Sequence, residues 1–76
     1  MAPVKYPVQG TESTAEIRMY DRVLLKSGYE ASIVEIFGGG ALFMADVDYP
    51  SGTETEDVSP EQIECIINIS ESSFEG

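Results

Sequence analysis

The chain has 76 residues, enough for one small domain, and its 14 acidic and 4 basic side chains give a net charge of −10. All four bases lie within the first 26 residues, and the eleven acids that follow have no base among them. Such a chain repels nucleic-acid backbones and anionic membranes and attracts basic surfaces. We therefore expect a protein partner with a basic surface, and no direct binding to nucleic acid or membrane. The alternative is that the charge serves only solubility.

The residue types also restrict the chemistry. Histidine is absent from the sequence, which removes Ser-His-Asp triads, Cys-His pairs and most zinc sites. Cys65 is the only cysteine, so an internal disulfide is excluded and a reducing, cytoplasmic location is expected. The N-terminus lacks the apolar run of a signal peptide. We expect a non-catalytic protein that needs no cofactor and has no metal site.

Residues 1–19 contain prolines and a glycine and show no long periodic pattern. A flexible N-terminal arm is expected there. Val4, Tyr6 and Val8 alternate with other residues, so an extra strand added to a sheet edge is the alternative. At the other end, residues 70–76 are predicted to form a polar C-terminal tail.

Between these ends, residues 20–69 read as one all-β domain. Five strands are predicted, at residues 22–26, 30–37, 41–49, 53–58 and 65–69. Three consecutive glycines at 38–40 indicate a hairpin turn. Ser59 followed by Pro60 and Gln62 indicates a short helical turn over residues 60–64, before the last strand. Alternation predicts the following core residues: Val23, Leu25, Val34, Ile36, Val47 and Ile63.

This pattern resembles a known family. Residues 21–26, 31–36 and 58–63 are similar to small bacterial SH3-like proteins related to KOW-type domains. The resemblance implies a small five-stranded SH3-like barrel with one short helical turn before the last strand. Ala31 stands where a glycine is usual in KOW modules, and the basic residues that suit nucleic-acid binding are missing. The resemblance therefore carries a fold expectation and no nucleic-acid partner.

The most acidic stretch is the predicted hairpin of residues 46–57. If residues 50–52 form a three-residue loop, Asp48 opposes Glu54 and Asp46 opposes Glu56, with all four carboxylates on one face. Like charges directly opposite destabilise a sheet by a few tenths of a kcal/mol per pair. We interpret such a face as a surface for a basic partner, with Ca²⁺ binding and an inert solvated face as alternatives. The EF-hand spacing fails, and no specific divalent site is predicted.

The sequence thus predicts a protein-binding module. Its partner-binding residues are expected to be Asp46, Asp48, Glu54, Glu56, Asp57 and Glu61. Its apolar anchors, where exposed, are expected to be Tyr29, Phe37, Phe43 and Tyr49. A sharper form is a nucleic-acid mimic that inhibits a nuclease, by analogy of composition with phage-encoded anti-CRISPR and anti-restriction proteins. The alternative function is structural, as an accessory SH3-like barrel in a larger assembly or a homo-oligomer joined through open strand edges.

Overall fold

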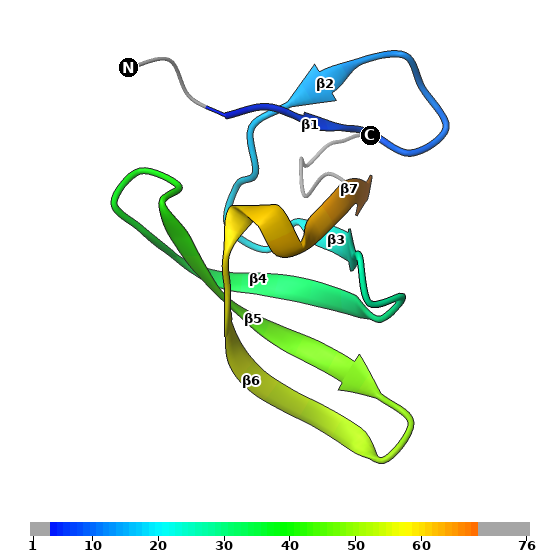
Figure 1. Cartoon of the computed structure of the whole chain (residues 1–76), viewed down its shortest axis with the longest axis vertical. Helices are drawn as coiled ribbons and strands as arrows, with labels where there is room; N and C mark the ends of the chain where they lie inside the picture. Colours follow the sequence, from blue (N-terminus) through cyan, green and yellow to red (C-terminus); the bar gives the residue numbers. More distant parts are fainter. Residues whose placement is uncertain (1–3, 69–76) are drawn as a thin grey trace, which may run out of the picture.

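The structure, a computed structural model, describes residues 4–68 and contains two antiparallel sheets (Figure 1). The smaller sheet pairs β1 (Tyr6–Pro7) with β2 (Thr14–Ala15). The larger sheet has the strand order β6-β5-β4-β3-β7. Its strands are β3 (Arg22–Leu25), β4 (Glu30–Phe37), β5 (Leu42–Tyr49), β6 (Gly52–Val58) and β7 (Ile63–Asn68). The predicted all-β class is confirmed. The predicted tail, and position 69 of the predicted last strand, lie outside the described residues.

Strands β3 to β6 form a meander, because each pairs antiparallel with the next. The chain then passes through the 3₁₀ turn η1 (Pro60–Gln62) and returns to pair β7 with β3. The side-chain Oε1 of Gln62 accepts hydrogen bonds from the backbone N–H of Ser59 at 2.8 Å and from its hydroxyl at 3.1 Å, which closes this turn. The helical turn before the last strand is therefore present. It is shorter than predicted, and β7 begins at Ile63 instead of at residue 65.

A β-bulge in β4 changes the predicted core assignment of this strand. Ile33 pairs with Ala45 and Glu35 pairs with Met44, so Val34 is an extra residue with no partner of its own in β5. An extra residue reverses which side chains point inward along the rest of the strand. Ile33, before the bulge, and Ile36, after it, therefore both lie opposite buried residues of β5, on the inward face. Ile33 is fully buried, Ile36 is half-buried and packs against the core, and Val34 is half-buried. Simple alternation thus missed Ile33 and wrongly placed Val34 in the core, while Ile36 lies at the core margin.

The N-terminal segment supplies part of the core. Tyr6 and Ile17 are buried, and the Tyr6 ring meets Phe43 edge-on with 6.4 Å between ring centroids. Val8 forms a parallel bridge with Ile66, next to β1, and the Gln9 N–H donates to the Ile66 carbonyl at 2.8 Å. Residues 4–19, expected as a flexible arm or an extra strand, thus contain the β1–β2 sheet and a short contact with the free edge of β7.

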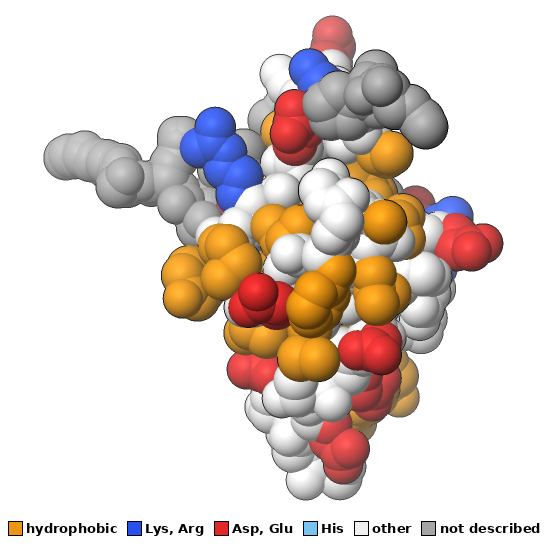
Figure 2. Space-filling view, turned by 90° about the vertical axis from the view of Figure 1, so that its left-hand side faces the viewer, with side chains coloured by type: hydrophobic (Ala, Val, Ile, Leu, Met, Phe, Trp, Pro, Cys, Tyr) orange, Lys and Arg blue, Asp and Glu red, His pale blue; other side chains and the backbone are white. Residues whose placement is uncertain are grey.

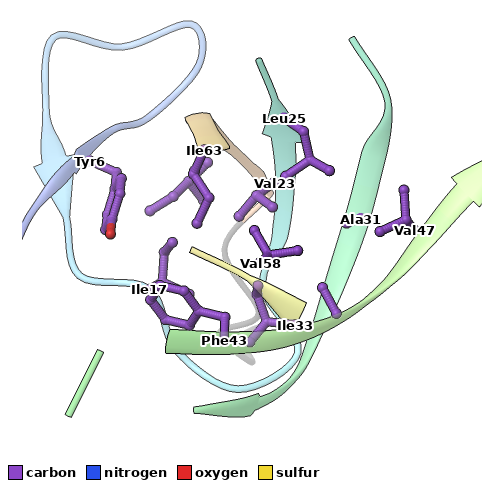
Figure 3. Close-up of a cluster of buried hydrophobic side chains, with 12 residues drawn as sticks. Tyr6, Ile17, Val23, Leu25, Ala31, Ile33, Phe43, Val47, Val58 and Ile63 are labelled. Carbon is purple, nitrogen blue, oxygen red and sulfur yellow. The ribbon is translucent and has the colours of Figure 1, made fainter. Parts of the chain in front are cut away.

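Twelve apolar side chains make one buried cluster (Figure 3). The figure shows Tyr6 and Ile17 closing the side opposite Leu25 and Val47. Of the six predicted core residues, Val23, Leu25, Val47 and Ile63 are buried. The cluster also takes in Phe43, Ala45 and Val47 of β5, whereas on β6 it takes in Val58. Residues 52–55 of β6, nearest the turn, are all exposed.

The bulge yields a stability prediction. Ile33→Ala should lower the free energy of unfolding by about 2–5 kcal/mol, because a fully buried side chain leaves a cavity. Ile36→Ala should cost at most about 1–2 kcal/mol, because part of that side chain is already in water. Urea unfolding of the two variants tests this difference. Equal losses, or a larger loss for Ile36→Ala, would contradict the central position of Ile33 and the marginal position of Ile36 in the core.

Candidate functional site

The acidic hairpin has a register that differs from the predicted one. Tyr49 pairs with Gly52, not with Thr53, so the loop has two residues instead of three. Gly52 has a φ of 138°, which favours glycine, and it belongs to β6. A shift of one residue moves every side chain of one strand to the other face. The prediction that four carboxylates share one face is therefore wrong.

On the outer face of the sheet, acids alternate with threonines across the two strands. Asp48 pairs with Thr53, and Asp46 pairs with Thr55. Each hydroxyl donates to the carboxylate opposite it, at 3.1 Å from Thr53 to Asp48 Oδ1 and at 2.5 Å from Thr55 to Asp46 Oδ1. These pairs replace the like-charge contacts that the sequence had suggested with favourable cross-strand hydrogen bonds.

Arg22 is the base that joins three strands on this face. Its Nε lies 3.3 Å from Glu30 Oε1, its Nη1 donates to Ser32 Oγ at 2.8 Å, and its Nη2 donates to Asp48 Oδ2. The guanidinium and the Thr53 hydroxyl together hold the pKa of Asp48 below its ordinary value. The sequence had separated the bases from the acidic hairpin, but β3 and β5 both flank β4 and bring Arg22 to Asp48.

On the opposite face, Glu54 and Glu56 share the side of Val47 and Ala45. Val47 and Ala45 are fully buried, whereas Glu54 is exposed and Glu56 is half-buried on β6, the last strand in the sheet order. The Tyr49 hydroxyl donates to Glu56 Oε2 at 2.6 Å. Negative charge therefore surrounds the hairpin and is not confined to one face.

The turn ends of two hairpins form an open depression near this charge, which we call the tyrosine hollow. It has a volume of about 430 Å³ and is lined by Arg22, Gly28, Tyr29, Glu30, Asp48, Tyr49 and Pro50. Tyr29 and Tyr49 meet edge-on at its side, with ring centroids 4.8 Å apart and planes at 68°. Two predicted anchors and one predicted acid are thus brought together, because the turn before β4, which carries Tyr29, lies beside the end of β5, which carries Asp48 and Tyr49.

The remaining predicted site residues are scattered. Asp57 is exposed on the outer face of β6, and Glu61 is exposed on η1. Phe37 is 41% exposed and can meet a partner, whereas Phe43 is only 2% exposed and is a core residue. In the view of Figure 2, acids lie on the narrow lower part of the molecule, which is the β5–β6 hairpin, and the basic side chains lie higher.

Two features of the surface were missed by the sequence reading. Arg22 and Glu30 line the tyrosine hollow, and their cross-strand pairing depends on the sheet order. Among residues 4–68, Tyr20 is the most exposed of the large apolar side chains, at 69%. It has a φ of 70° in a turn where the Asp21 carboxylate accepts from the Arg18 N–H at 2.8 Å. Residue Tyr20 carried no turn signal, because left-handed backbone is uncommon for an aromatic residue.

A second, much smaller cavity lies beneath the N-terminal sheet. It has a volume of about 20 Å³, is lined in part by Tyr6, Glu16 and Phe43, and is large enough for one water molecule. Within residues 4–68, no group of three or more His, Cys, Asp or Glu side chains is placed to hold a metal ion. The described part of the chain also has no helix of the length and apolarity needed to cross a membrane.

Comparisons with known proteins give no family assignment. No protein-family model, curated protein or solved structure matches the chain at a significant level. The geometry of the hairpin and of the tyrosine hollow is therefore what indicates a function.

The Tyr49–Glu56 contact gives a prediction about pH. Hydrogen bonding to the carboxylate, with a smaller effect of burial, raises the pKa of Tyr49 from 10.0 to about 12. The folded state therefore favours the protonated hydroxyl. This contribution to stability is complete below about pH 10 and is lost as the pH rises toward about 12.

Glu56→Gln should lower the pKa of Tyr49 toward its ordinary value, measured by NMR titration of the tyrosine rings. Tyr6 is the internal control, because burial raises its pKa without the help of Glu56. An unchanged Tyr49 titration in Glu56→Gln would show that the carboxylate does not hold this hydroxyl.

Proposed function

We propose that this chain is a non-catalytic protein-binding module that engages a basic segment of a partner protein through the β5–β6 hairpin and the tyrosine hollow. The observation that carries the proposal is the meeting of Tyr29 and Tyr49 with Glu30 and Asp48 in one depression. Tyrosine faces attract Lys and Arg side chains, and nearby carboxylates add charge attraction. The depression is shallow and open, which suits an inserted side chain of a partner better than an enclosed substrate.

The distribution of charge supports the same partner class. Glu54 and Glu56 act electrostatically on Tyr49 of the hollow, and Asp57 lies farther along β6, a strand that carries no base. Arg22 offsets one unit of charge within the hollow, where its two carboxylate contacts are Glu30 and Asp48. The hollow therefore keeps a net negative charge, which favours a cationic side chain over an anionic one.

The fold expectation belongs to this proposal. We propose that the larger sheet is an SH3-like barrel of the kind the sequence resembles. Its meander of four strands, the 3₁₀ turn and the return of β7 to β3 support this assignment. The nucleic-acid-mimic form needs carboxylates in one row, and the register divides them between two faces. We therefore propose the binding module in its general form, acting on a basic protein surface.

The structural alternative has one observation in its favour. Within residues 4–68, β5 is the strand that pairs with β6, and the other edge of β6 is open. Open edges join copies of a protein into oligomers. Two antiparallel copies of β6, however, would bring their acids together, which disfavours self-pairing. A salt series separates the functions, because apolar assembly strengthens or is unaffected when salt screens charge.

The first test of this function is a charge reversal. Glu54→Lys with Asp57→Lys changes the hairpin by four units, and both side chains are exposed. At low salt this variant should associate with a partner isolated from a lysate about tenfold more slowly or worse, because opposite charges steer association. Stopped-flow mixing at two salt concentrations measures the effect, which should shrink at high salt.

The matched control is Glu12→Lys with Glu64→Lys, which makes the same change in net charge away from the hairpin. It should associate at nearly the wild-type rate. If the hairpin variant associates as fast as wild type at low salt, the acidic hairpin is not the binding surface. The exposed Tyr20 and Phe37 would then be examined next.

The second test addresses the hollow. Tyr29→Ala should weaken the complex by about tenfold or more, as expected when an aromatic anchor of an interface is truncated. The domain should stay folded, because 38% of Tyr29 is exposed. Calorimetric titration measures the affinity, and Phe37→Ala is the control for loss of an exposed aromatic. Equal effects of the two substitutions would assign no special role to the hollow.

A further inference from the structure

We propose that the open edge of β6 binds an extended basic segment of the partner as an added β-strand. This inference rests on the proposed function and specifies how the partner segment is held. The site is the row of main-chain groups along β6, and the acidic side chains decide which segment it accepts. Strand addition of this kind takes its affinity from main-chain hydrogen bonds and its specificity from alternating side chains.

The two outer edges of the larger sheet, on β7 and β6, differ in how far they are already paired. The outer edge of β7 is partly occupied, because Gln9 donates to Ile66 and Val8 bridges the same residue. Strand β6 lies at the opposite end of the sheet order, and in the described part of the chain its partner is β5. Every second residue of such a strand points both its N–H and its C=O away from its neighbour. These groups on β6 are available for another strand.

The pairing of β6 with β5 is regular along the whole strand. The β4–β5 and β3–β7 pairings contain register shifts, whereas β5 and β6 pair without a shift from Gly52 to Val58. Bulges and prolines are common devices that prevent an edge from accepting a strand. Strand β6 has neither of them. Its protection is charge alone, which opposes acidic or identical strands and favours basic ones.

The side chains of β6 favour a basic segment as the added strand. Glu54 and Glu56 point to one face of β6 at alternate positions, and Thr53, Thr55 and Asp57 point to the other. An added strand with Lys or Arg at every second position would place its cations beside the two glutamates. Its intervening side chains would lie beside the threonines. A basic strand is thus matched at both faces, while a second copy of β6 is not.

The experiment uses two capped peptides as long as β6. One alternates lysine with threonine, and the other has proline in place of threonine, so its charge is equal but it cannot form the same ladder. The lysine–threonine peptide should bind at least about tenfold more tightly, since each main-chain hydrogen bond contributes severalfold to affinity. NMR hydrogen exchange should show slower exchange at alternate amides of β6, only with this peptide.

A charge swap provides the matched variant. Glu54→Lys with Glu56→Lys should weaken binding of the lysine–threonine peptide by about tenfold or more, and should create binding to a glutamate–threonine peptide. This rescue distinguishes altered specificity from damage to the hairpin, including loss of the Tyr49–Glu56 hydrogen bond. The control variant Glu12→Lys with Glu64→Lys should keep the wild-type preference for lysine.

The outcomes separate this inference from the proposed function. Equal binding of both lysine peptides, without protection of β6, would overturn strand addition and leave a basic-partner module standing. Binding of neither peptide would count against both proposals. Protection of β6 amides that rises with protein concentration would assign the edge to a second copy. Protection already present in the dilute free chain would show an edge covered from within, and each of these last two results overturns the inference.

Discussion

The pairing of Tyr49 with Gly52 is the constraint on which the acidic hairpin depends. A two-residue loop sets the register of β5 against β6, and the register decides the face of every side chain that follows. With this closure Asp48 meets a threonine hydroxyl, and Glu56 is left to accept the Tyr49 hydroxyl. With one more loop residue, carboxylates would oppose carboxylates along the hairpin. The length of this loop therefore determines whether carboxylates in the most acidic part of the chain oppose one another or oppose other side chains.

The same arrangement limits repulsion between carboxylates in a small domain of large net charge. Hydroxyls accompany the aspartates, and Arg22 takes up two carboxylates across β4. Exposed ion pairs of this kind contribute little energy, about 0–1 kcal/mol each. Their main effect is to fix where Asp48 and Glu30 point, at the side of the Tyr29–Tyr49 pair. Within the hairpin, Glu54 and Asp57 have no such contact, and both are exposed on β6 at the outer edge of the sheet, where a partner can approach.

Much of the fold could be predicted because it depends on local signals. The β-branched run of β4, the glycine turn after Phe37 and the Ser-Pro-x-Gln turn before β7 each depend on adjacent residues. The bulge at Val34 could not, because no glycine or proline marks it and only the pairing with β5 reveals the extra residue. The residue types of the site could be predicted, but their arrangement in space could not. Tyr29, Tyr49 and Asp48 were chosen for their type, but their meeting with Arg22 depends on strand order, which local patterns do not encode.

The contact between Val8 and Ile66 has a consequence for how the chain reaches this structure. It joins segments from near opposite ends of the described chain, while β4, β5 and β6 pair only with strands adjacent to them in sequence. Contacts of short sequence separation form first as a rule, because closing a long loop costs more entropy. During synthesis, Val8 and Gln9 cannot make their contacts with Ile66 until β7 has emerged, whereas the Tyr6 ring packs on Phe43 of the earlier strand β5. The junction between the N-terminal segment and β7 is therefore among the last parts of this fold to form.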